Sequence, residues 1–254
     1  MRRIGEEFYS EVDGDYDEKA YNSNLFIQKF WQRHKIESVL NYVKRGEFVL
    51  DLGSGSGVVS DKIANMGCEV VAADLSLGKI KNCRKKNPQT LGVVCDGRDL
   101  PFKEGSFDRV ICIEVIEHIP QAEKCVSEIS RVLGDNGELV LTTPNYRSLW
   151  PVVEYLWDTL GKGIDYRLQH VSKFNKDSLV KSLGTGGLEV LEVRTIFFFT
   201  PLSSLFSKRL TASIVKFEEK FLHSIDAGML VVVLARRMNG TILYPGKTIG
   251  KEAL

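Results

Sequence analysis

The chain of 254 residues has the length of one domain, or of one domain with an appended segment. Its hydrophobic fraction of 43% is ordinary for a globular protein, and a net charge of +1 argues against binding nucleic acid through an overall field. The longest apolar run, residues 229–235, is too short to span a bilayer. Scattered cysteines without a C-x-x-C pair and a start without an apolar signal core favour a cytoplasmic protein.

The N-terminal part, residues 1–45, is expected to form helices or a lid. Residues 1–17 are acidic and aromatic and are expected to be a loop or a lid. Residues 18–45 place apolar side chains at helical spacing, which predicts helices that pack on a sheet. Within this stretch Arg33 is the residue that we follow as a candidate for a binding site, although a single arginine on a helix is usually solvated.

A regular alternation of apolar runs and helix-like segments fills residues 46–196. The expected strands are 47–52, 69–73, 91–95, 107–113, 138–142 and 188–194, and the expected helices are 57–66, 76–86, 120–133 and 176–183. Strands that alternate with helices form a parallel sheet with helices on both faces. The predicted fold class is therefore α/β, a Rossmann-like doubly wound, mostly parallel sheet with helical insertions that form a cap.

Three glycines alternate with serines directly after the first expected strand, in the run Asp51-Leu52-Gly53-Ser54-Gly55-Ser56-Gly57. Glycine permits tight backbone angles and the close approach of a ligand, and the N–H groups of the following helix can bind an anion. The dinucleotide pattern G-x-G-x-x-G/A would place its third glycine at Val58, which does not fit. A nucleotide-like ligand is predicted, and a NAD-type site or a plain tight turn remain the alternatives.

Acidic residues stand at the ends of four successive expected strands, namely Asp51, Asp74, Asp96 and Glu114. Ligands on parallel sheets bind at the carboxyl ends of the strands. Because the four acids stand at equivalent positions at these ends, they predict one polar crevice. Asp74 lies about 20 residues after Gly53, where an acid suits a ribose diol, while helix capping is its alternative role. Asp96 can accept a hydrogen bond from an adenine amino group, or can belong to an ordinary Asp-Gly turn.

The C-terminal part departs from this alternation. Residues 146–171 are rich in aromatic residues and leucine and are expected to form a cap segment, and residues 227–254 are expected to hold the last strand, 228–236, and a tail. Between them, residues 197–226 are expected to be an amphipathic helical insertion with Thr200 as its N-cap. Its apolar residues recur every three or four positions: Leu202, Phe206, Leu210, Ile214, Phe217, Phe221 and Ile225.

This apolar stripe allows two interpretations. One helix, or two helices broken near Thr211, can bury the stripe against the domain, as amphipathic helices usually do. Alternatively, the insertion is a lid over an apolar acceptor pocket, and basic residues such as Lys216 and Lys220 help its outer face to dock on an anionic membrane.

Four motifs together resemble those of the class I S-adenosylmethionine (SAM) dependent methyltransferases, in particular the quinone-biosynthesis and small-molecule groups. They are V-L-D-L-G-S-G-S-G, A-A-D-L-S, D-G-R-D-L-P-F with G-S-F-D, and E-V-I-E-H-I, and the resemblance covers about residues 30–195. It implies a seven-stranded sheet whose last strand is antiparallel, with SAM as cofactor and S-adenosylhomocysteine as product. The cofactor-binding residues that it implies are Arg33, Asp51, Gly53, Ser54, Gly55, Asp74, Leu75, Asp96, Gly97 and Ile113.

The resemblance also assigns places along the cofactor. It puts Gly53 and Gly55 under the methionyl part, Asp51 near its amino group and Asp74 on the ribose. It puts Asp96 and Gly97 at the adenine and Ile113 in the pocket wall, whereas the match of Arg33 to a cofactor-facing arginine is weaker.

His118 and His170 are the candidate catalytic residues. Methyl transfer from a sulfonium depends mainly on alignment, and a base is needed only where the acceptor atom carries a proton. Glu114, Glu117 and His118 share one face if their segment is helical, and with His170 they are similar to the set by which some relatives hold magnesium or another divalent ion. We assign a catalytic role to both histidines and no residue to a metal, and keep a metal site and a structural role as alternatives.

The sequence thus predicts a SAM-dependent methyltransferase that acts on a small, apolar molecule. A NAD-type oxidoreductase and a SAM-binding regulatory module without catalysis are the alternatives. We expect no nucleic-acid partner, and we expect a cytoplasmic location with contact at the membrane surface through residues 197–226.

Overall fold

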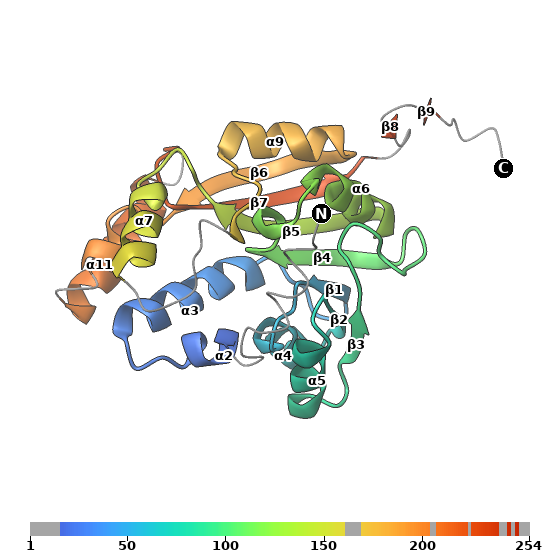
Figure 1. Cartoon of the computed structure of the whole chain (residues 1–254), viewed down its shortest axis with the longest axis horizontal. Coiled ribbons are helices and arrows are strands. Elements are labelled where there is room, and N and C mark those ends of the chain that lie inside the picture. The colour runs from blue at the N-terminus through green and yellow to red at the C-terminus, as the bar shows by residue number, and fades with distance from the viewer. Residues whose placement is uncertain are drawn as a thin grey trace.

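The computed structural model describes residues 16–160, 169–203, 207–222, 225–238, 243–244 and 247–248. A seven-stranded sheet in the order β3-β2-β1-β4-β5-β7-β6 forms its centre (Figure 1). The strands are β1 (Phe48–Leu52), β2 (Glu69–Asp74), β3 (Leu91–Val94), β4 (Phe107–Ile113), β5 (Leu133–Pro144), β6 (Leu188–Ile196) and β7 (Leu230–Arg237). β1 to β5 pair in parallel, and β7 runs antiparallel to both β5 and β6. This confirms the predicted mostly parallel α/β sheet with an antiparallel last strand, which lies between β5 and β6.

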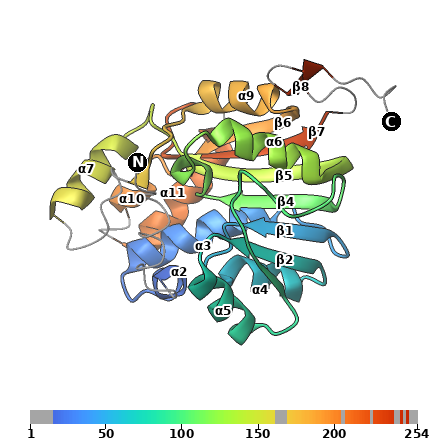
Figure 2. The ribbon, with the colours of Figure 1, turned by 45° about the vertical axis from the view of Figure 1, so that its right-hand side comes forward.

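Helices cover both faces of the sheet (Figures 1 and 2). They are α2 (Tyr16–Tyr21), α3 (Phe26–Leu40), α4 (Val58–Asn65), α5 (Leu77–Lys86), α6 (Ala122–Val132), α7 (Trp150–Leu160), α9 (Lys176–Thr185), α10 (Thr200–Ser203) and α11 (Lys208–Phe221). α3, α4 and α5 lie on one face, and α6 and α9 on the other. Two of these helices have capped starts: Ser76 accepts a hydrogen bond from an N–H of α5, and Asn175 forms a reciprocal capping box with Ser178 at the start of α9.

Alternate residues of each central strand enter different apolar cores, because successive side chains of a strand point to opposite faces. Leu50 and Val110 pack with α6 and α9, whereas Val49 and Ile111 pack with α3 and α4. Both cores are fully buried in the centre of the sheet, so the carboxyl ends of the strands are held in one fixed row. That row is where the polar residues predicted from the sequence stand.

The predicted cap segment, residues 146–171, contains α7, which joins α3 through an aromatic cluster. Trp31 of α3 stacks on Phe197 with ring centroids 4.0 Å apart, and Trp150 of α7 lies 5.8 Å from Trp31. Both views place α7 beyond the same end of the sheet as α11 (Figures 1 and 2). Residues 161–168 of the predicted cap and 1–15 of the predicted N-terminal lid lie outside the described residues.

The insertion differs from its predicted form in where it divides and in which face it buries. α10 ends at Ser203, and Ser207 caps α11, so the chain divides before Ser207 and not near Thr211, which lies inside α11. Thr200 is the first residue of α10 and does not cap it; its hydroxyl donates to the buried carboxylate of Glu218, 2.7 Å away. Within the described residues, no helix combines the length and apolarity needed to cross a membrane.

Candidate active site

The glycine turn after β1 has the left-handed backbone that the sequence predicts. Gly53, Gly55 and Gly57 have φ angles of 74°, 54° and 84°, values that side-chain-bearing residues rarely adopt. A Cβ on Gly53 would lie 2.2 Å from a methyl group of Val115, and one on Gly57 would lie 2.4 Å from the sulfur of Cys83. The turn therefore needs glycine both for its backbone angles and for its close packing against Val115, after β4, and Cys83 of α5.

Two of the predicted cofactor acids hold this turn in place. Both oxygens of Asp74, at the end of β2, accept backbone N–H groups, from Gly55 at 3.0 Å and from Ser76 at 2.9 Å. Asp51, the fourth residue of β1, is buried and accepts a hydrogen bond from the hydroxyl of Ser60 in α4 at 2.5 Å. A carboxylate is the group that binds the hydroxyl or ammonium groups of a ligand, which is the role that the resemblance gives to both acids.

The remaining predicted cofactor residues lie around the same strand ends. Asp96 accepts from the backbone N–H and the Nε of its neighbour Arg98, at 2.9 and 3.0 Å, so its carboxylate is already engaged. A Cβ on Gly97 would come within 3.2 Å of Cys125 and Ile119. The predicted residues Ser54, Leu75 and Ile113 stand in the glycine turn, directly after β2 and at the end of β4. Their roles toward a cofactor stay predictions.

The described contact of the Arg33 side chain is with α2, whereas Lys35 of the same helix contacts a residue at the carboxyl ends of the strands. The Arg33 side chain is exposed and lies 5.0 Å from the ring of Tyr21 in α2. Lys35, two positions further along α3, is buried and forms an ion pair with Glu114, directly after β4. Positions two apart face nearly opposite sides of a helix, which explains why only one of the two cations reaches the strand ends. Sequence reasoning missed Lys35, and no local signal marks it.

Glu114 begins the segment that carries the candidate catalytic residues. Its φ of 50° is left-handed, a strained conformation for a residue with a side chain. The short helix η1 (Ile116–His118) follows and turns Glu117 inward, where the carboxyl group is fully buried. Thr143 donates to Glu117 Oε2 at 3.0 Å, while Oε1 has no hydrogen-bond partner among the described residues. Burial, and next the charge of Glu114, raises the pKa of Glu117 to about 8.

His118 lies beside Glu117 and faces His170. Its Nδ1 is 3.2 Å from the carbonyl oxygen of Gln169, which can only accept, so Nδ1 carries the proton and Nε2 the lone pair. Burial, and next the charge of His170, lowers the pKa of His118 to about 3. The imidazole of His118 is therefore neutral at physiological pH and can act as a ligand or as a hydrogen-bond acceptor.

His170 is buried in a polar network with two residues that the sequence did not single out. Its Nδ1 lies 2.8 Å from the hydroxyl of Tyr146 and 2.7 Å from Oε1 of Glu154, which projects from α7. Tyr146 also donates to Glu154 at 2.8 Å. Burial lowers the pKa of His170, against the opposing charge of Glu154. The rings of His118 and His170 are 4.9 Å apart, so the two predicted catalytic residues are brought together.

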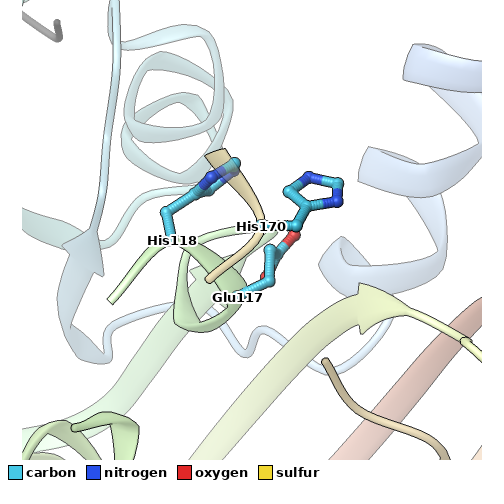
Figure 3. A group of neighbouring side chains, drawn as sticks. All are labelled: Glu117, His118 and His170. Atoms are coloured by element: carbon cyan, nitrogen blue, oxygen red, sulfur yellow. The ribbon is translucent and has the colours of Figure 1, made fainter. Parts of the chain in front are cut away.

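Glu117, His118 and His170 form a group whose donor atoms fit a divalent cation (Figure 3). One ligand atom from each lies within 4.8 Å of the others. The partnerless Glu117 oxygen and two neutral imidazoles are the donor set of borderline metal ions, and both imidazoles are oriented by a carbonyl or carboxylate oxygen, as metal ligands usually are. Glu114, the fourth member of the set considered from the sequence, is instead paired with Lys35.

Comparison with known proteins gives a consistent result. Residues 50–141 match the model of a methyltransferase domain. The chain is 32% identical over 158 residues to a demethylmenaquinone methyltransferase of Paenarthrobacter aurescens, a match that spans 60% of this chain and 61% of the relative. It is 27% identical over 219 residues to a ubiquinone biosynthesis O-methyltransferase of Coxiella burnetii, which spans 78% of this chain and 92% of the relative.

The fold agrees with these matches. The magnesium protoporphyrin IX methyltransferase of Synechocystis, solved with bound S-adenosylhomocysteine, superposes with a TM-score of 0.63 at 20% identity, over 92% of this chain and 98% of that one. Residues 50–141 of this chain therefore match a methyltransferase domain, and the fold is similar to that of a methyltransferase solved with bound S-adenosylhomocysteine.

Proposed function

We propose that the protein transfers the methyl group of SAM to a small, apolar acceptor of the quinone-precursor type, with the histidine pair at the acceptor end. The observation that supports this most directly is the contact between the glycine turn and the segment after β4: Val115 packs against Gly53, three residues before His118. The two curated relatives are named for demethylmenaquinone and for ubiquinone biosynthesis. Turnover of a phenolic quinone precursor with SAM, measured by mass spectrometry, tests the proposal, and absence of any methylated product contradicts it.

In this reaction the acceptor atom forms a bond to the methyl carbon while the bond from that carbon to the sulfonium sulfur breaks. S-adenosylhomocysteine leaves, and a hydroxyl acceptor must also release its proton. Because the sulfonium is a good leaving group, holding acceptor, methyl carbon and sulfur in line is the larger part of catalysis. The glycine turn, Asp51 and Asp74 hold the cofactor side, and the neutral His118 and His170 are placed to take up or orient the acceptor proton.

A second role for the same residues has its own support. A general base works best when its pKa is near the working pH, and the pKa of about 3 for His118 is far below it. A low pKa is instead suited to a ligand that must stay unprotonated. Glu117, His118 and His170 would hold a divalent cation, whose binding would displace the proton that the raised pKa of about 8 leaves on Glu117 and would lower the pKa of a coordinated hydroxyl. We therefore propose that a cation assists deprotonation of the acceptor at this group.

Binding of SAM should depend on Asp74. Asp74→Ala should weaken binding by about 1–3 kcal/mol, since it leaves ribose hydroxyls without an acceptor and releases the N–H of Gly55 from its partner. Asp74→Asn keeps one acceptor oxygen and should lose less. Calorimetry with SAM, and with NAD as the ligand expected to give no heat, measures this. Asp61→Ala, an acid of α4 outside the turn, is the control; equal affinity of Asp74→Ala and the parent would rule the contact out.

The acceptor is proposed to reach the protein from a lipid surface. In α11 the buried face consists of Thr211, Val215 and Glu218, with Glu218 accepting N–H groups of Phe199 and Thr200 at 2.6 and 2.9 Å. Four residues of the predicted apolar stripe lie on the outside: Leu210, Phe217, Phe221 and Ile225 are between 46 and 56% exposed. Ile214 is half-buried, and the side chains of Leu202 and Phe206 lie outside the described part of the structure. Arg209, Lys216 and Lys220 are exposed on the same helix. Exposed aromatic and basic side chains on one helix suit the interface of an anionic membrane.

The cap helix supports the same surface. Val152, Tyr155 and Leu156 of α7 are exposed, and α7 stands with α11 beyond one end of the sheet (Figure 2). Apolar patches that a monomer leaves uncovered mark interaction sites more often than chance. We therefore propose that the protein is cytoplasmic and that it contacts the membrane surface through α7 and α11.

Removing the outer aromatic residues should abolish this contact. The double variant Phe217→Ser and Phe221→Ser should no longer sediment with vesicles of phosphatidylglycerol, while its melting temperature and SAM affinity stay those of the parent, because both rings are exposed. Leu91→Ser with Leu191→Ser removes exposed apolar groups from the two edge strands and is the matched control. Equal sedimentation of both double variants would contradict docking through α11.

A further inference from the structure

His170 is held by two buried hydrogen-bonding side chains, Glu154 and Tyr146, which also contact each other. Glu154 and His170 are each 3% exposed at the side chain, and Nδ1 of the imidazole is 2.7 Å from Glu154 Oε1. The Tyr146 hydroxyl lies 2.8 Å from the same oxygen and 2.8 Å from the same nitrogen. Three polar atoms from α7, from the segment after β5 and from the segment before α9 thus meet at mutual hydrogen-bond distance.

The positions of the protons follow from the chemistry of these three groups. A phenol has one proton, and Tyr146 donates it to Glu154 Oε1. An unprotonated Nδ1 at 2.7 Å from a carboxylate oxygen would oppose two lone pairs, so Nδ1 must carry a proton and donate it. The lone pair of His170 is then on Nε2. The tautomer of a histidine is set in this way by the hydrogen bond that its other nitrogen makes.

We propose that Glu154 is a positioning residue of the active site: it fixes His170 as the Nδ1–H tautomer and so supplies Nε2 as the nitrogen with a lone pair to the group shared with Glu117 and His118. This rests on the proposed role of His170 in acceptor chemistry. Glu154 itself acts through the imidazole. The inference also gives α7 a chemical role, because this helix presents Glu154 to the interior and Val152 and Tyr155 to the outside.

Removal of the carboxylate should reverse the tautomer. In Glu154→Leu the Tyr146 hydroxyl loses its acceptor and turns its proton to Nδ1, which moves the imidazole proton to Nε2. In Tyr146→Phe the carboxylate remains and Nδ1 should keep its proton. Glu154→Gln offers an amide oxygen in the same place and should keep the parent tautomer. The three variants therefore show whether the tautomer of His170 depends on the acceptor oxygen at position 154, on the volume of that side chain or on the hydroxyl of Tyr146.

Heteronuclear NMR of the imidazole nitrogens, on protein dialysed against EDTA, reads the tautomer directly, with His170 assigned from its own replacement. We expect Nδ1–H in the parent, Tyr146→Phe and Glu154→Gln, and Nε2–H in Glu154→Leu. An Nε2–H parent, or an unchanged tautomer in folded Glu154→Leu, overturns the proposal. If Glu154→Leu does not fold, the parent and Tyr146→Phe spectra decide alone, because Nε2–H in either contradicts the assignment.

Kinetics then separate this proposal from the proposed function. Glu154→Leu should lower turnover by about 10–100-fold, the usual effect of losing a residue that orients a site imidazole, without changing SAM affinity. Glu154→Gln should recover most of it. A reversed tautomer with unchanged turnover would keep the positioning contact but remove His170 from the reaction. Parent turnover that is absent with every acceptor would count against the proposed function and leave the tautomer result standing.

Discussion

Alanine at His118 should reduce methyl transfer by about 100-fold or more while the affinity for SAM stays unchanged. The side chain is held by the carbonyl oxygen of Gln169 and forms one side of the group with Glu117 and His170, so we expect its loss to act on the acceptor end of the site and not on the cofactor. Single-turnover kinetics with excess SAM measure the chemical step, and calorimetry measures the cofactor. His34→Ala, a histidine of α3 stacked on Phe30 and outside this group, is the control.

The same assay shows which role the group has. For a cation site, EDTA should abolish turnover of the parent, and a divalent ion such as manganese or zinc should restore it, because the bound ion would supply the lowering of the acceptor's pKa. For a base, EDTA should have no effect. Full activity of both His118→Ala and His170→Ala would leave the pair with a structural role only.

The sheet could be predicted from the sequence because each of its elements has a local signal. β1, β2 and β4 are apolar runs that end in an acid or a glycine, and α5 and α9 begin at Ser76 and Asn175, residues typical of helix starts. Observed ends differ from predicted ends by one or two residues for most elements. β5 is longer than predicted, since it begins at Leu133 and passes through Gly134 and Gly137, which have no strand propensity of their own.

Side-chain contacts between distant elements could not be predicted in this way. Lys35 reaches Glu114 from a different layer of the fold, and Glu154 reaches His170 across a segment that contains residues outside the described part. Neither contact has a periodic or spacing signal, because each depends on how two helices pack against the sheet. The resemblance to known methyltransferases drew attention to Arg33, but the structure brings the neighbouring lysine to the strand ends.

The insertion shows a further limit. Periodicity correctly finds that α11 has an apolar and a polar side, yet it does not tell which side is buried. Glu218 decides the orientation: its carboxylate accepts both the N–H and the hydroxyl of Thr200, which fixes that side of the helix against α10. The apolar side is then left at the surface, where Phe217 and Phe221 are more than half exposed.

Replacing Lys35 by methionine should lower the free energy of unfolding by about 3–5 kcal/mol, the usual result of removing one partner of a buried ion pair. Glu114 would then lose its cationic partner at a position where the backbone is left-handed and already strained. Lys35→Met with Glu114→Gln removes both charges and should recover most of the loss. Urea denaturation measures all three proteins, and Lys86→Met, which breaks a half-exposed ion pair with Glu18, is the control.

The pH dependence of stability has a definite sign in the metal-free protein. The pKa of Glu117 is raised to about 8 from an ordinary value of 4.5, so over this range the folded state holds a proton that the unfolded state has released. The contribution of Glu117 is therefore fully present below pH 4.5 and is lost as pH rises through about 8. In Lys35→Met the free energy of unfolding should be lower than in the parent at the pH where this loss begins. In Glu117→Gln the fall in the free energy of unfolding with rising pH should disappear. A stability curve for Lys35→Met that coincides with the parent's at every pH would show that the ion pair contributes nothing to folding.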